Sequence, residues 1–78
     1  MTRTFREGRL LFDPPSERWE IWDAYDHQES VHCGESFEMK VGNEFIPCRM
    51  EMDSEWYVIF RNTSFYLHPR ISYWIRVR

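Results

Sequence analysis

The chain has 78 residues, of which 18% are aromatic, and its formal net charge is −3 at pH 7. This length suits a single domain with one core, residues 1–78, and the acidic balance disfavours general nucleic-acid binding. The longest apolar run is too short to span a membrane, and the N-terminus lacks the apolar region of a secretory signal, so we expect a cytoplasmic protein that makes no membrane contact.

Two short strands are predicted near the N-terminus. The first covers residues 8–13, with Leu10 and Phe12 on one face, and it ends at two prolines because proline lacks a backbone donor. The second covers residues 18–22 and returns along the first. The polar residues 23–31 predict a loop.

The clearest pattern is a hairpin at the centre of the chain. Residues 36–41 alternate between apolar and polar side chains, as in a half-buried strand, and Gly42-Asn43 is a two-residue turn signal. The turn and the apolar pattern give the same register. It pairs Val41 with Glu44, Met39 with Ile46 and Phe37 with Cys48.

A second turn is predicted at Asp53-Ser54. With a two-residue loop it pairs Met50 with Tyr57 and places Trp56, Val58 and Phe60 on the outer face, beside Phe45. A loop of three residues would reverse that assignment.

The C-terminal part completes a small all-β fold. Residues 62–70 predict a connection with one short helical turn, and residues 72–78 predict a last strand. About six short strands favour a five- to six-stranded barrel, SH3-like as the first choice and OB-like as the alternative, because closure removes exposed strand edges. In such a barrel the first and last strands lie side by side.

A specific motif runs from His32-Cys33-Gly34-Glu35 to Trp56-Tyr57. With this motif, the chain resembles a family of small domains of unknown function from Gram-positive bacteria and their mobile elements. The resemblance covers roughly residues 8–60. The chain departs from the family pattern at Cys48, where threonine is usual, and in its more aromatic and basic tail. The resemblance implies a common fold and lends no activity.

The cysteines and histidines do not predict a metal site or a catalytic centre. His27, His32, Cys33 and Cys48 are zinc-ligand types, but adjacent residues of a strand point to opposite faces and no paired-cysteine motif is present. We therefore expect reduced cysteines, no metal, no cofactor and no enzymatic activity. The run His32, Cys33, Gly34 and Glu35 is interpreted as a structural turn, in which glycine supplies a positive φ.

Charge is distributed unevenly along the sequence. Residues 10–60 carry three basic and twelve acidic side chains, whereas residues 61–78 carry four arginines and no acid. Either the basic ends form a binding surface with aromatic residues, or they neutralise the acidic middle. The candidate binding residues are Arg9, Phe45, Trp56, Arg70, Trp74, Arg76 and Arg78.

Three functions fit these features. The first is a non-catalytic binding or adaptor module whose partner is another protein. The second is a nucleic-acid-binding accessory domain that uses the basic C-terminal strand, since aromatic residues beside arginines suit base stacking. The third is a subunit that dimerises through an aromatic face, so the chain is expected to be a monomer or a weak homodimer.

Overall fold

The protein is all-β. The computed structural model describes residues 6–23 and 28–77, and these residues contain no helix. They form eight strands: β1 (Arg6–Asp13), β2 (Arg18–Asp23), β3 (Gln28–Ser30), β4 (Ser36–Val41), β5 (Glu44–Met52), β6 (Trp56–Phe60), β7 (Thr63–Tyr66) and β8 (Tyr73–Val77). Within these ranges no helix has the length and apolarity needed to cross a membrane.

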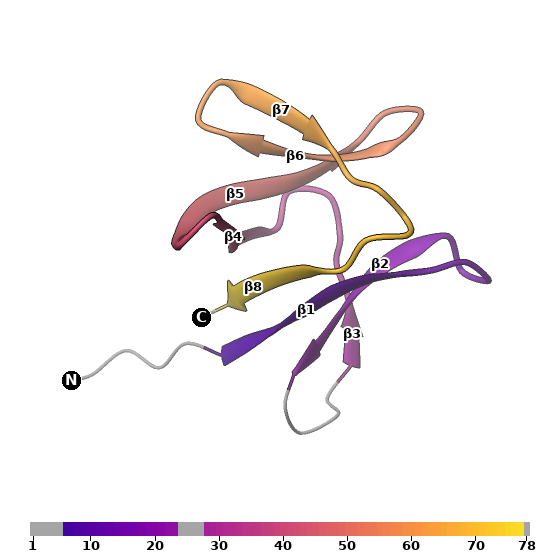
Figure 1. Cartoon of the computed structure of the whole chain (residues 1–78). Helices are drawn as coiled ribbons and strands as arrows, with labels where there is room; N and C mark the ends of the chain where they lie inside the picture. The colour runs from indigo at the N-terminus through magenta and orange to yellow at the C-terminus, as the bar shows by residue number, and fades with distance from the viewer. Residues whose placement is uncertain (1–5, 24–27, 78) are drawn as a thin grey trace.

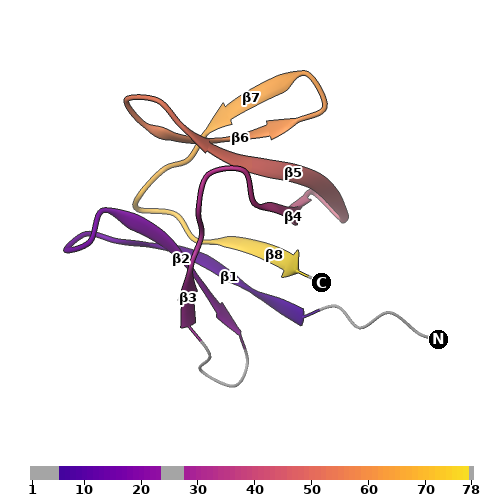
Figure 2. The same cartoon turned by 180° about the vertical axis from the view of Figure 1, so that it is seen from behind.

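The strands form one antiparallel sheet in the order β3-β2-β1-β8-β4-β5-β6-β7. The sheet is folded over, so that β4 to β7 lie across from β1, β2, β3 and β8 (Figures 1 and 2). The two halves are joined where β4 pairs with β8, at Glu38–Arg76 and Met39–Ile75. The first and last strands, β1 and β8, lie side by side, as the sequence predicts.

The core lies between the two halves of the folded sheet. Both halves contribute buried side chains, since Leu10 and Trp19 come from β1 and β2, while Met50 and Val58 come from β5 and β6. The complete buried set is Leu10, Trp19, Ile21, Val31, Phe37, Met39, Cys48, Met50, Val58, Leu67 and Ile75. Every residue of this core is apolar or a thiol, so shape and apolar area hold the two halves together.

The central hairpin has the predicted register. Val41 pairs with Glu44, Met39 with Ile46 and Phe37 with Cys48. Gly42 has φ +64°, whereas Asn43 does not have a positive φ, which is the pattern of a type II′ turn. Phe37, Met39 and Cys48 are buried, and Ile46 is half-buried at the end of the same face.

The predicted register of the next hairpin is wrong by one residue. Met52 pairs with Trp56 and Met50 with Val58, so the loop has three residues. The side chain of Asp53 explains this, because its Oδ1 accepts a hydrogen bond of 2.9 Å from the backbone N–H of Glu55. This bond lowers the pKa of Asp53. As a result Trp56 and Phe60 pack against the core instead of forming an outer aromatic set with Phe45.

Two strands were absent from the sequence-based prediction. β3 lies in the predicted loop of residues 23–31 and pairs with β2. β7 replaces the predicted connection with a helical turn, and it pairs with β6 across a two-residue turn in which Arg61 has φ +55°. The described strands number eight instead of five or six, and their sheet is curled and ends at β3 and β7 without closing.

Candidate functional site

A row of aromatic and basic side chains crosses the outer face of the sheet. Arg9 of β1 is paired with Trp22 of β2 on one side and with Trp74 of β8 on the other. The two indoles are among the large apolar side chains exposed at the surface, Trp22 by 36% and Trp74 by 53%. We call Trp22, Arg9 and Trp74 the outer row.

Arg9 is held in place by Trp74 of β8 and by Ser72, the residue just before that strand. Its guanidinium carbon lies 4.9 Å from the ring centroid of Trp74, and its Nη2 donates a hydrogen bond of 2.6 Å to Oγ of Ser72. A cation over an indole face is attracted by the ring quadrupole. Arg9 and Trp74 are therefore ordered before anything binds to the outer row, while its side chains stay exposed.

Arg76 has a different role, although it lies on the same face. Its Nη2 is 3.0 Å from Oε1 of Glu38, and its guanidinium carbon is 4.1 Å from the ring centroid of Phe45. Arg76 is also paired across the strands with Glu7. This arginine neutralises the carboxylate of Glu38 and covers Phe45.

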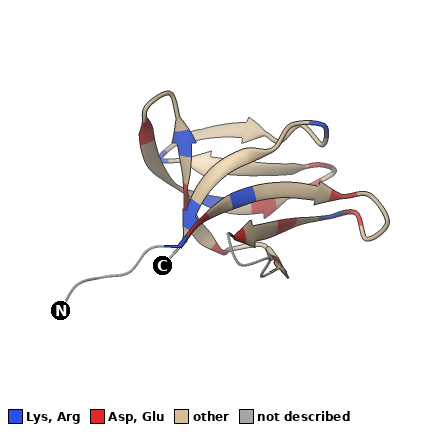
Figure 3. Ribbon diagram, turned by 60° about the horizontal axis from the view of Figure 1, so that its bottom comes forward, with Lys and Arg blue, Asp and Glu red and all other residues tan. Residues whose placement is uncertain are grey.

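The basic ends of the chain pair with the acidic middle. Besides the Arg76–Glu38 contact, Arg6 lies 3.3 Å from Asp23 and 3.1 Å from Glu29. Blue and red segments are interspersed over the strands in Figure 3. Of the two alternatives drawn from the sequence, neutralisation of the acidic middle holds for Arg6 and Arg76, because strand pairing brings the two ends of the sequence next to its middle.

The other predicted binding residues do not join the outer row. Arg70 is exposed in the turn before β8, and Arg78 lies outside the described residues. Trp56 lies on the inner face, where its Nε1–H donates to the backbone oxygen of Glu17 at 3.1 Å. Phe45 lies on the outer face of β5, one strand beyond Glu38, under Arg76.

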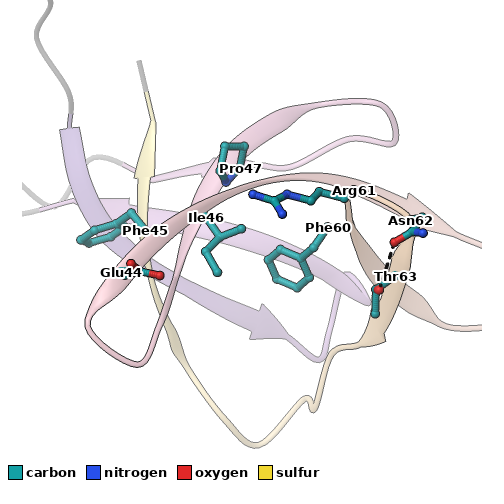
Figure 4. Close-up of a pocket in the computed structure, with 8 residues that line it drawn as sticks. All are labelled: Glu44, Phe45, Ile46, Pro47, Phe60, Arg61, Asn62 and Thr63. Atoms are coloured by element: carbon teal, nitrogen blue, oxygen red, sulfur yellow. Dashed lines mark hydrogen bonds between the residues drawn. The ribbon is translucent and has the colours of Figure 1, made fainter.

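An open hollow of about 810 Å³ lies beside the first half of β5, where the strand extends beyond its pairing with β6. Phe45 and Phe60 both line it, but their rings lie well apart in Figure 4. Pro47 lies in the middle of this strand edge and has no N–H to donate to an added strand. The hollow is lined by Glu44, Phe45, Ile46, Pro47, Phe60, Arg61, Asn62 and Thr63.

The His32–Glu35 segment forms a structural turn, as predicted. The backbone N–H of Glu35 donates to the oxygen of His32 at 3.2 Å, and Gly34 has φ +88°, which is typical of a type II turn. The N–H of Gly34 donates to the oxygen of Met50, and the oxygen of Glu35 accepts from the N–H of Met50. These two backbone hydrogen bonds attach the turn to β5, just before the β4–β5 strand pairing begins at Ser36.

The side chains of His32, Cys33 and Glu35 in that turn are exposed and do not form a cluster. Nη2 of Arg18 donates to Nδ1 of His32 at 2.8 Å, so Nδ1 is the acceptor of that bond. Cys33 is exposed and Cys48 is buried, and both are free thiols. Among residues 6–23 and 28–77 no three potential ligands gather as a metal site would require, and His27 falls outside these ranges.

The sequence profile of a family described as Domain of unknown function (DUF5348) matches residues 8–77. The chain belongs to this family. The match includes the resemblance seen in residues 8–60 and extends through the aromatic tail. The outer row lies within it.

The DUF5348 chain is also similar to a solved structure. A crystal structure of a protein from Ruminococcus gnavus, determined by structural genomics, has a TM-score of 0.75 and 32% sequence identity. The similarity covers 92% of this chain and 100% of that one. No curated protein matches the sequence.

The two thiols of this DUF5348 domain are expected to differ strongly in reactivity. Burial raises the pKa of Cys48 to about 12, and the thiolate is the reactive form of cysteine. In the native protein at neutral pH we expect one thiol, Cys33, to react rapidly with a disulfide reagent, and a second only after denaturation. Two rapidly reacting thiols, or none, would contradict this prediction.

Proposed function

We propose that this domain is a non-catalytic protein-binding module of the cytoplasm and that the outer row is its contact surface. The observation that carries the proposal is the arrangement of Trp22, Arg9 and Trp74 as direct cross-strand neighbours with exposed side chains. Trp and Arg are the residue types that most often dominate the binding energy of protein interfaces. A rigid sheet presents them here without further folding.

The order of the outer row favours binding. Arg9 is already stacked on Trp74 and bonded to Ser72, so little side-chain freedom is lost when a partner docks. Its charge suits a carboxylate on the partner, because guanidinium and carboxylate groups form strong hydrogen bonds. The expected partner is a protein with an acidic segment beside an apolar one.

The test compares matched surface variants in affinity capture, followed by titration with the purified partner. We expect Trp74→Ala and Arg9→Ser each to weaken binding at least about tenfold, as for hot-spot residues, with little change in the thermal unfolding midpoint. Arg61→Asn is the matched control, because it removes the same charge from an exposed turn away from the outer row and keeps a residue that tolerates positive φ. If Trp74→Ala and Arg9→Ser bind the partner no more weakly than Arg61→Asn does, the outer row is excluded as the contact surface.

Arg76→Ser separates binding from stability. Arg76 pairs with Glu38 and stacks on Phe45, so this variant is expected to lower stability by removing a partner from a half-buried carboxylate. If Arg76→Ser weakens partner binding as much as Arg9→Ser does while stability is unchanged, the division of roles between the two arginines is wrong.

Single-stranded nucleic acid is the second candidate partner. Rings and cations alternate along the outer row, and Lys40 and Phe45 extend the same face on β4 and β5. Stacking platforms of this composition bind single strands without sequence preference. The carboxylates of Glu7 and Glu38 on this face oppose such binding.

Titration with a short oligothymidylate at low and physiological salt distinguishes the two partners. A nucleic-acid binder would show quenching of the Trp22 and Trp74 fluorescence and a steep loss of affinity as salt rises. We expect no saturable binding at physiological salt. A salt-dependent affinity that Trp74→Ala abolishes would replace the protein partner with nucleic acid.

A further inference from the structure

We propose that a second site, a pocket at the turn end of the folded sheet, binds a lysine or arginine side chain of a partner peptide. The pocket has a volume of about 440 Å³. Three aromatic rings line it, those of Phe12, Trp19 and Trp56, together with the carboxylate residues Glu17 and Glu55. This is an aromatic pocket with an acidic rim, which is distinct from the outer row in position and in charge.

The rings of this pocket are fixed by their own contacts. Trp19 is fully packed in the core and its ring centroid lies 5.4 Å from that of Phe12. Trp56 is held by the bond from Nε1 to the backbone oxygen of Glu17 and by the bond that its own backbone oxygen accepts from Leu67. Because these contacts exist without a ligand, the pocket does not need to rearrange to be occupied.

The charge of the rim selects the ligand. Glu17 and Glu55 lie on the two turns that flank the pocket, β1–β2 and β5–β6, and no Lys or Arg is among the described residues that line it. Asp53 lies next to the pocket-lining Ser54, and its charged carboxylate accepts hydrogen bonds from Glu55 and Tyr66. Carboxylates beside the half-buried rings of Phe12 and Trp56 attract a cation and disfavour an anion.

One of these rings, that of Trp56, already forms a cation–π contact with an arginine of the same chain. The guanidinium carbon of Arg18 lies 5.7 Å from the ring centroid of Trp56, and this side chain is bonded to His32 and does not line the pocket. The ring of Trp56 is thus already shown to accommodate a guanidinium group near its face. The flanking Pro14 and Pro69 give the rim an apolar surface against which the stem of a long side chain can pack.

The test uses a terminally blocked peptide of alternating arginine and glycine, and the same peptide with each arginine replaced by citrulline. Citrulline keeps the shape and lacks the charge. The readout is the set of four tryptophan indole N–H resonances in the NMR spectrum, with that of Trp56 assigned from Trp56→Phe. We expect the arginine peptide to shift the Trp56 resonance in a saturable way and the citrulline peptide to bind about tenfold more weakly or not at all.

A charge-matched pair of variants provides the control. Glu17→Gln with Glu55→Gln is expected to weaken the arginine peptide about tenfold, whereas Glu7→Gln with Glu44→Gln, which removes the same charge elsewhere, is expected to leave binding unchanged. Equal effects of both pairs, or equal binding of the two peptides, would overturn the proposal. Shifts of Trp22 and Trp74 alone would also overturn it, and they would locate the peptide on the outer row. Loss of partner binding by Trp74→Ala tests the outer row independently of this result.

Discussion

Replacing Trp19 by alanine is expected to remove most of the stability of this domain at 25 °C. The indole of Trp19 is 1% exposed, is the largest fully buried side chain and contacts the rings of Phe12 and Tyr73, with centroid distances of 5.4 and 5.9 Å. Removing a buried aromatic side chain costs about 3–5 kcal/mol. A domain of this size has a total stability near the lower end of about 5–15 kcal/mol, so the loss consumes most of it.

The matched control for this variant lies three residues further along the same strand. Trp22 has the same side chain but lies on the outer face, so Trp22→Ala is expected to cost less than about 1 kcal/mol. Urea unfolding followed by circular dichroism compares the two variants. If Trp19→Ala proves too unstable to measure, Trp19→Phe keeps a ring in the core and is expected to fall between the wild type and Trp19→Ala. A Trp22→Ala variant as unstable as Trp19→Ala would contradict the assignment of inner and outer faces.

The parts of the fold that were predictable from the sequence are those where two signals agree. In the β4–β5 hairpin the turn at Gly42 and the apolar alternation of the strands specify one register, and the structure has it. At Asp53 only the turn signal was present. A side-chain oxygen that accepts the N–H of Glu55 lengthened that loop by one residue and exchanged the faces of β6.

β3 and β7 lacked the signal on which strand prediction depends. All four residues of β7 are exposed, so they show no alternation between apolar and polar side chains. β3 has only three residues, and they are polar. Both strands lie at the ends of the sheet, where one neighbouring strand supplies the hydrogen bonds and little area is buried.

Two of the three residues of the outer row, Arg9 and Trp74, were predictable from the sequence. Pairing of the first and last strands predicted that Arg9 and Trp74 share a surface, and they are in contact. Trp22 was not predicted as a site residue. Its spacing from Trp19 does place it on the outer face, but its position across from Arg9 depends on the length of the β1–β2 turn. The pocket of Phe12, Trp19 and Trp56 was not predicted, because it needs Trp56 on the inner face.

Gly8→Ala is expected to destabilise the domain by about 1–3 kcal/mol, although glycine to alanine in a strand is usually favourable. A Cβ at Gly8 would lie 2.5 Å from the backbone oxygen of Trp22 and 3.2 Å from its carbonyl carbon. Backbone atoms cannot rotate away as a side chain does, so β1 and β2 must separate where the outer row begins. This cost exceeds the gain of about 0.4–1 kcal/mol from a less flexible unfolded chain.

A second glycine variant shows that the effect of Gly8→Ala is steric. At Gly42 a Cβ meets no atom within 4 Å, but φ is +64°, so Gly42→Ala is expected to cost about 1–2 kcal/mol through backbone strain alone. Urea midpoints give both costs, and amide shifts locate them: we expect Gly8→Ala to perturb the amide of Asp23 in β2, and Gly42→Ala to perturb only the turn. A Gly8→Ala variant as stable as the wild type, with the Asp23 amide unmoved, would contradict this prediction. It would mean that β1 and β2 leave room for a Cβ at position 8.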